Sequence, residues 1–278
     1  AYQNALSYAK ERKQGKANNS NNKDADFIIK HADIRRSLMN MKSLIEGQRS
    51  LAFWVSQQID VSLNHSDTTI KKNANDMVSM MTPLIKSFFT DIGMEITNDA
   101  IQVFGGYGYT KDQGVEQLFR DNRITPIYEG TNSVQAIDLV FRKILNNNIY
   151  DNYIAQITKE IQEYEKNKEL VLFVQKFQKY VELINNFTSW LIEKNKNSKD
   201  DVSAACNDYL KVLGYLGLAH SWLKILKVSY DKYDTNKSFF EDKINTATYY
   251  FDKILPRAQS HYLSAVTGSK SMMKANFN

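Results

Sequence analysis

The stretch that decides the fold is residues 101–144, which read IQVFGGYGYTKDQGVEQLFRDNRITPIYEGTNSVQAIDLVFRKI. Apolar residues lead into it at every third or fourth position through 76–104, the spacing of one buried face of an α-helix. Gly105 and Gly106 follow, and glycine at such a position ends a helix. A further helix is expected from about Asn132, so the stretch predicts two helices with an irregular connection between them.

The connection at 105–130 is the least regular part of the chain. It holds five of the 11 glycines and one of the 3 prolines, around a short helix expected at roughly 114–121. Backbone without side chains lets a bulky ligand come close. Asn132 has Gln135 at the spacing of a capping box, and the start of a helix offers N–H groups and a positive dipole end to a phosphate or an oxyanion.

Glu129 stands in this connection, directly ahead of the expected helix start. A carboxylate in such a loop can reach a ligand, and desolvation would raise its pKa into the range of a general base. On residue type and position alone, a structural interpretation is the more frequent one, in which the negative charge only caps the helix dipole.

The rest of the chain is expected to be helical. With 3 prolines and 11 glycines in 278 residues, turn signals are too sparse for strand-and-turn architectures. The long helices are expected at 1–13, 31–60, 76–104, 152–166, 168–193, 200–232 and 237–267, with Pro83 in the first turns of the third and polar connections at 15–26 and 61–75. These elements predict an all-α fold in two domains, a helical bundle at 1–147 and a helical extension at 148–278.

Composition narrows the class of protein. Apolar residues make up 42% and charged residues 24%, as in a globular chain that buries a core. The net charge of +5 comes from Lys and Arg mixed with Asp and Glu at helical spacing, which is typical of solvated helix faces and disfavours nucleic acid as a partner. The sequence contains no run of about 18 apolar residues, so no membrane span is predicted.

Cysteine and histidine usage adds two expectations. The single cysteine, Cys206, is expected in the core and suggests a reducing, cytoplasmic compartment. The four histidines lie far apart without the spacing of metal ligands, so no metal site is predicted. The chain also opens in the middle of a helical pattern, which suggests a piece of something longer.

Residues 101–144 closely resemble the acyl-CoA dehydrogenase family. The likeness rests on three elements: Gln102 with Gly105 and Gly106, the pair Arg120-Asp121, and Tyr-Glu-Gly-Thr-Asn at 128–132. The step of 27 residues from Gln102 to Glu129 also matches.

The resemblance extends over most of the chain. Residues 8–15 resemble the family's Tyr-Ala-x-x-Arg segment, and 31–51 resemble a helix of a subgroup with an extended C-terminus. The region after residue 150 resembles that subgroup's helical appendage. Relatives with this extension include enzymes that act on saturated chains and on the 3-methylmercaptopropionyl thioester, so the acyl group stays open.

The resemblance implies an FAD-dependent enzyme that dehydrogenates an acyl-CoA thioester between its α and β carbons. Glu129 matches the base that takes the α-proton while hydride passes to flavin N5, and Gly130 lies where family members contact the substrate. Five residues match flavin contacts, some of them made across a subunit interface: Arg12, Gln102, Gly105, Gly106 and Thr131. Two departures, Gln14 before the glycine of the Arg segment and Ser133 after the Thr, bear on the adenine and diphosphate contacts.

The resemblance also implies partners. These are an acyl-CoA substrate, electron-transfer flavoprotein as electron acceptor, and further copies of the chain in a homodimer or homotetramer. The family's N-terminal helical domain and middle β-domain are not in this chain, so the chain alone is expected to hold flavin poorly. The alternative is a non-catalytic relative that serves as a nucleic-acid-binding or structural module, against which the Tyr-Glu-Gly-Thr element argues.

Overall fold

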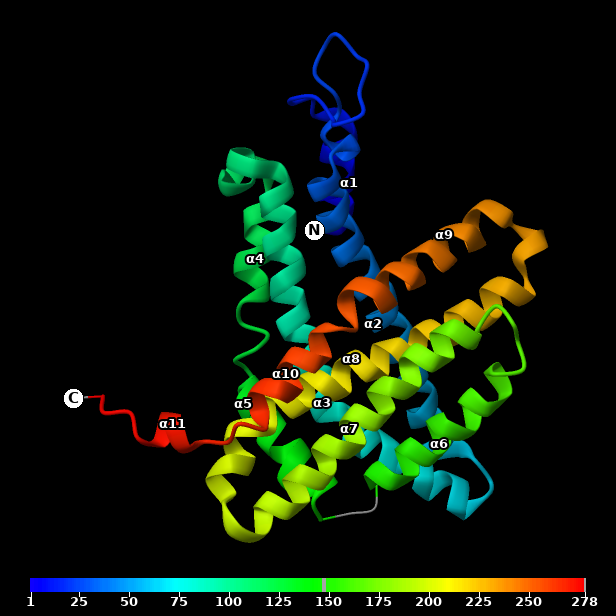
Figure 1. The fold of residues 1–278 in the computed structure, drawn as a ribbon, viewed down its shortest axis with the longest axis vertical. Coiled ribbons are helices and arrows are strands. Elements are labelled where there is room, and N and C mark those ends of the chain that lie inside the picture. The colour runs from blue at the N-terminus through cyan, green and yellow to red at the C-terminus, as the bar shows by residue number, and fades with distance from the viewer. Residues whose placement is uncertain (147–148, 278) are drawn as a thin grey trace. The chain divides into compact units, whose positions relative to one another are not determined.

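A computed structural model describes residues 1–146 and 149–277, and within these ranges the chain is built from helices (Figure 1). The described residues contain no strand, only an isolated antiparallel bridge between Lys13 and Phe27. The all-α prediction is confirmed. The chain divides into two compact units, the first formed by Ala1–Glu46 with Phe89–Glu129 and the second by Gly47–Phe88 with Gly130–Asn278. The domain boundary predicted between residues 147 and 148 lies outside the described residues.

The first unit brings the end of one long helix beside the N-terminal helix. Its elements are α1 (Tyr2–Glu11), η1 (Ile28–Lys30), the first part of α2 (Ala32–Asn64), the last part of α3 (Thr68–Phe104), η2 (Gly105–Tyr109), η3 (Lys111–Gln113) and α4 (Val115–Asn122). Ala5 and Ala9 of α1 are fully buried, and the ring of Tyr8 stacks on that of Phe104 with 4.2 Å between centroids. Burial of this face of α1 therefore fixes the position of the chain at the C-terminal end of α1.

Helix α3 starts earlier than the sequence pattern suggests. The connection predicted at 61–75 is wrong for most of its length, because α3 already begins at Thr68. The Asp67 carboxylate accepts hydrogen bonds from the backbone N–H groups of Thr69 at 2.7 Å and Ile70 at 3.1 Å, which caps the helix. Pro83 consequently lies well inside α3 rather than in its first turns.

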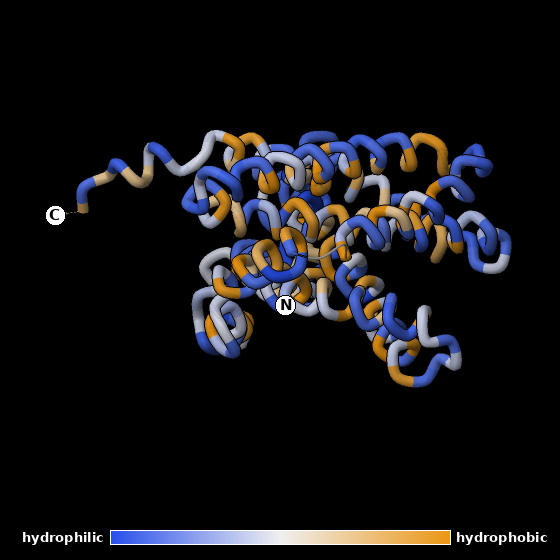
Figure 2. Tube along the Cα trace, turned by 90° about the horizontal axis from the view of Figure 1, so that it is seen from below, coloured by the Kyte–Doolittle hydropathy of each residue, from blue (hydrophilic) through white to orange (hydrophobic). Residues whose placement is uncertain are grey.

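The second unit is organised around α8, which packs against α7, α9 and α10 (Figure 1). Its elements, besides the remaining parts of α2 and α3, are α5 (Asn132–Asp138), η4 (Leu139–Ile144), α6 (Ile149–Tyr164), α7 (Val171–Asn197), α8 (Lys199–Asp231), η5 (Tyr233–Thr235), α9 (Lys237–Tyr249), η6 (Tyr250–Ile254), α10 (Arg257–Ala265) and α11 (Lys270–Met273). Every residue from 212 to 223 is buried, as expected of a central helix that is covered on all sides. Outer helices alternate apolar and polar residues along their turns (Figure 2).

One helix of the second unit differs between pattern and structure. The helix predicted over 237–267 is interrupted, since α9 passes into the π-helical turn η6 and α10 begins only after Pro256. Proline lacks the N–H that would continue the helical ladder, which accounts for the break. Gly214 of α8 has a packing role, because a Cβ there would lie 2.5 Å from the ring of Phe88. Cys206 is fully buried, as predicted.

Within the described residues, no helix combines the length and apolar character that crossing a membrane requires.

Candidate functional site

A groove in the first unit brings together three of the five predicted flavin residues. It lies where α1 and α3 end and has a volume of about 250 Å³. Arg12, Gln102 and Gly105 all line it, together with the stacked pair Tyr8 and Phe104. The groove thus combines a guanidinium, an amide, bare backbone and an aromatic wall.

Glycine is required at Gly105 by the backbone and leaves the groove open. Gly105 has φ +61°, a left-handed conformation that side-chain-bearing residues rarely adopt. A Cβ at Gly105 or at Gly106 would meet no heavy atom within 4 Å. The space beside this backbone can therefore receive a ligand. Tyr107, which follows these glycines, is 52% exposed, and its ring centroid lies 5.9 Å from Cζ of Arg12.

Arg12 opens a segment that we call the polar loop, residues 13–27. The loop is closed by backbone pairing at its base: Gln14 N–H donates to the Asp26 carbonyl at 3.0 Å, and Asp26 N–H donates to the Gly15 carbonyl at 2.8 Å. Ile28 N–H donates to the carbonyl of Arg12 at 2.8 Å. The backbone of Arg12 is therefore fixed by the same pairing that closes the loop.

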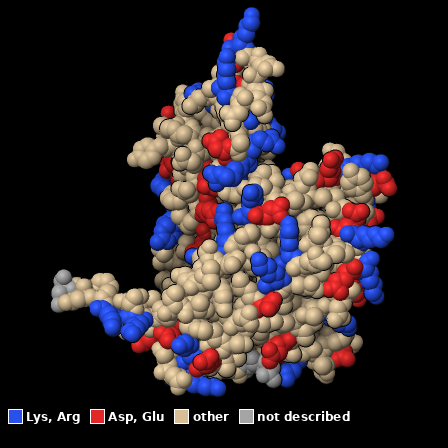
Figure 3. All heavy atoms as spheres, in the orientation of Figure 1, with Lys and Arg blue, Asp and Glu red and all other residues tan. Residues whose placement is uncertain are grey.

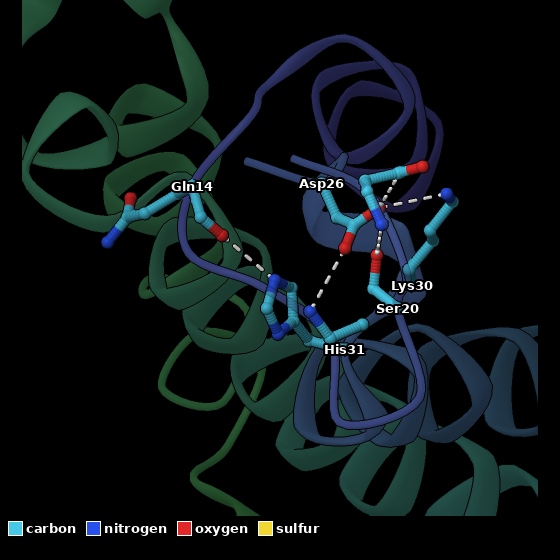
Figure 4. Close-up of polar contacts among 7 residues, drawn as sticks. Gln14, Ser20, Asp26, Lys30 and His31 are labelled. Carbon is cyan, nitrogen blue, oxygen red and sulfur yellow. Dashed lines mark hydrogen bonds and ion pairs between the residues drawn. The ribbon is translucent and has the colours of Figure 1, made fainter. Parts of the chain in front are cut away.

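The Asp26 carboxylate is the anchor of the polar loop (Figure 4). Only 1% of Asp26 is exposed, and its carboxylate accepts hydrogen bonds from the Ala17 N–H at 3.1 Å, the Asn22 amide at 2.6 Å and the Lys30 ammonium at 2.9 Å. Hydrogen bonds from the side chains of Ser20 and Lys30 hold the pKa of Asp26 well below its ordinary value. The sequence analysis did not single out Asp26, whose only signal is an acidic residue at the end of an Asn-rich run.

His31 adds a second tie to the polar loop. Its Nε2–H donates to the carbonyl of Gln14 at 2.9 Å, and both residues line the groove (Figure 4). The backbone of Gln14 thus connects the loop to the start of α2.

Glu129 belongs to a second segment, the base loop, residues 123–131. Among the described residues Glu129 is the only non-glycine residue with positive φ, at +53°, and Gly130 follows with φ +85°. A left-handed backbone costs an ordinary residue of the order of 1–3 kcal/mol and is concentrated at active sites and ligand clamps. The backbone therefore marks Glu129 independently of any sequence motif, and its side chain is exposed.

Helix α5 starts where predicted, but the capping box predicted for it is wrong. The N-cap is Thr131, and no side-chain hydrogen bond caps the helix. The amide of Asn132 is engaged elsewhere, because it donates to the Ser87 carbonyl at 3.1 Å and accepts from the Lys86 ammonium at 2.9 Å. Contacts with α3 thus replace the local cap.

The predicted residues fall into two groups. Arg12, Gln102 and Gly105 share the groove, and Gly106 continues its backbone. Glu129, Gly130 and Thr131 are consecutive in the base loop and are not among the residues that line this groove. Arg120 has a structural contact, since its guanidinium binds the Glu116 carboxylate through Nε at 2.6 Å and Nη2 at 3.1 Å. Within the described ranges, no group of three or more His, Cys, Asp or Glu residues could hold a metal ion.

Comparison with known proteins identifies the family. The family model described as "Acyl-CoA dehydrogenase, C-terminal domain" matches residues 1–145, and the one described as "Acetyl-CoA dehydrogenase C-terminal like" matches residues 154–276. The chain belongs to the acyl-CoA dehydrogenase family.

Individual relatives agree with this assignment. A 3-methylmercaptopropionyl-CoA dehydrogenase of Ruegeria pomeroyi is 41% identical over 145 residues, which are 52% of this chain and 24% of that protein. A butyryl-CoA dehydrogenase of Syntrophomonas wolfei is 26% identical over 99% of this chain and 45% of its own length. The crystal structure of an acyl-CoA dehydrogenase with FAD from Bacillus anthracis has the same fold, with a TM-score of 0.73 and 16% identity over 98% of this chain and 47% of that one. The chain spans less than half the length of these proteins.

Proposed function

We propose that this chain is the flavin-binding and base-bearing helical part of an FAD-dependent acyl-CoA dehydrogenase. The observation that carries the proposal is the backbone of Glu129, which is held in a left-handed conformation directly before α5. A strained, exposed carboxylate fits a base better than a dipole cap, because a cap needs no positive φ. Relatives named as acyl-CoA dehydrogenases support the same chemistry.

The groove residues fit a flavin dinucleotide. The Arg12 guanidinium suits a diphosphate, and the Gln102 amide can hydrogen-bond to polar groups of the cofactor. The open backbone at Gly105 and Gly106 admits a bulky group. When bound, the flavin would accept the β-hydrogen of the acyl group as hydride. The proposal also takes in Thr131, whose hydroxyl makes no cap bond to α5.

The chain's own residues then account for the proton transfer. The α-carbon of a thioester is weakly acidic, and the Glu129 carboxylate takes its proton. Negative charge develops on the thioester oxygen as that proton leaves, and backbone N–H groups are suitable donors to it. The N–H of Gly130, which follows the base directly, is the proposed contact with the substrate.

The experiment uses the protein at its full natural length. We expect purified protein to carry FAD and to reduce an artificial electron acceptor with a panel of acyl-CoA thioesters, including butyryl-CoA and 3-methylmercaptopropionyl-CoA. Glu129→Gln should keep FAD and lower kcat by about 10³-fold, because it removes the base alone. Normal turnover by Glu129→Gln would overturn the proposal.

Electron-transfer flavoprotein is the proposed physiological acceptor, and the proposed assembly is a homodimer or homotetramer. Adding that flavoprotein to the assay and measuring the mass of the protein in solution test these two points. Lys and Arg are interspersed with Asp and Glu on the face drawn in Figure 3, which suits a solvated surface better than a nucleic-acid track.

A further inference from the structure

Lys86 of α3 makes two hydrogen bonds to the chain segment that follows Glu129. Its ammonium donates to the carbonyl of Gly130 at 2.7 Å and to Oδ1 of Asn132 at 2.9 Å. These partners lie 44 and 46 residues further along the chain. Lys86 is partly exposed, and of its two bonds the one to Asn132 is partly buried and the one to Gly130 is exposed.

The neighbouring residue of α3 completes the attachment. Ser87 is 1% exposed, and its carbonyl accepts from the Asn132 amide at 3.1 Å. Its hydroxyl donates to the carbonyl of Asn132 at 3.5 Å. We call these four bonds the α3 clamp. It holds residues 130–132 from one turn of a long helix rather than from within the loop.

The α3 clamp acts on the carbonyl that directly follows the strained residue. Glu129 and Gly130 have φ +53° and +85°, two left-handed residues in succession. Such a conformation persists only where surrounding contacts over-determine it. A charge-assisted bond to the Gly130 carbonyl supplies such a contact, because hydrogen bonds to an ionised group are shorter and stronger than neutral ones.

We propose that Lys86 is a positioning residue for the proton transfer. By holding the Gly130 carbonyl it fixes the direction in which the Glu129 side chain leaves the backbone, and it does not touch the substrate. The inference rests on the proposed function of Glu129 as the base. It assigns to Lys86 a role that the residue's type and its place in an ordinary helical pattern do not reveal.

The test compares Lys86→Met with Lys86→Arg in the full-length protein. Methionine keeps the apolar stem and removes both bonds, whereas arginine keeps the charge and can still donate to a carbonyl. We expect Lys86→Met to lower kcat by about 10- to 100-fold at nearly constant KM and FAD content, as a misplaced catalytic group does. Lys86→Arg should recover most of the loss.

Isotope substitution separates positioning from a general structural defect. With a thioester deuterated at the α-carbon, Lys86→Met should show a larger kinetic isotope effect on kcat than the wild type, because proton abstraction becomes more nearly rate-limiting. Lys72→Met, which alters an exposed lysine of the same helix, is the matched control and should leave kcat unchanged.

Three results would contradict a positioning role for Lys86. The inference is overturned if Lys86→Met keeps wild-type kcat. It is also overturned if kcat and FAD content fall while KM rises, and arginine does not restore them. Should Lys86→Met fail to fold, Lys86→Gln, which keeps a polar head but removes the charge, takes its place, and wild-type kcat in that variant would overturn the inference. Failure of the proposed function is seen separately, as normal turnover by Glu129→Gln.

Discussion

The polar loop and the base loop are each held by one charged side chain that binds both backbone and side-chain atoms, but the charges differ in sign and origin. In the polar loop the anchor is an anion, Asp26, which comes from the loop itself and is 1% exposed. In the base loop the anchor is a cation, Lys86, which comes from α3 and binds a carbonyl. The first loop carries its own anchor, whereas the second takes its shape from a helix far away in sequence.

The difference has a physical consequence for each loop. The Asp26 carboxylate stabilises its loop locally, since its hydrogen-bond partners lie only four to nine residues away in the chain. The base loop instead holds a left-handed residue, which needs an external contact. A self-anchored loop suits a binding surface, and an externally anchored loop suits a group whose direction must be exact to fractions of an ångström.

Among substitutions that keep the Glu129 carboxylate, the largest expected effect follows from adding one methyl group to the base loop. Gly130→Ala puts a Cβ at φ +85°, a backbone conformation that residues with side chains rarely adopt, with Gln135 Nε2 3.3 Å away, so the substitution strains the backbone next to Glu129. We expect kcat to fall by about 10²-fold because Glu129 then points elsewhere. Steady-state kinetics and FAD absorbance measure this.

Gly114→Ala is the matched control for that substitution. Gly114 also has positive φ, at +65°, but a Cβ there meets nothing within 4 Å. It should cost a similar free energy of unfolding, about 1–2 kcal/mol, with kcat retained. An equal loss of kcat in both variants would show that strain at either glycine slows the enzyme, and that the direction of Glu129 is not the cause.

The second effect concerns the polar loop. Asp26→Asn removes the negative charge that binds Lys30. It also puts a buried amide NH₂ group among hydrogen-bond donors, where it finds no acceptor in place of the lost carboxylate oxygen. Since the same loop pairs with the backbone of Arg12, we expect the Kd for FAD to rise about tenfold, the value of one charge-assisted contact. Titration of apoprotein with FAD measures it, together with protease cleavage within residues 13–27.

Asp24→Asn, an exposed carboxylate of the same loop, should change neither quantity. If Asp26→Asn binds FAD as the wild type does, the anchor holds only the loop and not Arg12.

A smaller effect is expected from acid. The pKa of Asp26 is depressed in the folded chain, so its contribution to stability is complete above the unfolded pKa of about 3.9 and is lost as pH falls below it toward the folded value. Hydrogen exchange of the amide of Ala17 should therefore be equally protected at pH 7 and pH 5, after correction for intrinsic rates, and lose protection below about pH 3.9. Protection that already fails above pH 5 would contradict this assignment.

The contrast between the two loops also shows how far sequence patterns reach. The family resemblance pointed to Arg12, Gln102 and Gly105 separately, and the structure brings them to one groove because they lie at or next to the ends of α1 and α3. Lys86 could not be singled out, since one lysine in an amphipathic helix looks like any other and its partner is 44 residues away. Local rules failed where a tertiary contact captured the side chain, as when α3 took up Asn132 and left the predicted capping box unformed.

The smallest effect is a change in the free energy of unfolding, which tests whether the left-handed backbone at Glu129 is strained. Asparagine adopts the left-handed region more readily than glutamate does, so Glu129→Asn should raise the free energy of unfolding by about 0.5–1 kcal/mol while abolishing turnover. Glu129→Gln, which lacks that backbone preference, should lose turnover without any gain. Urea unfolding of the two variants beside the wild type measures the difference. Equal free energies of unfolding for all three would mean that the left-handed conformation at residue 129 costs the protein no stability. A higher value for Glu129→Asn would mean that the base is kept at this position at the expense of stability.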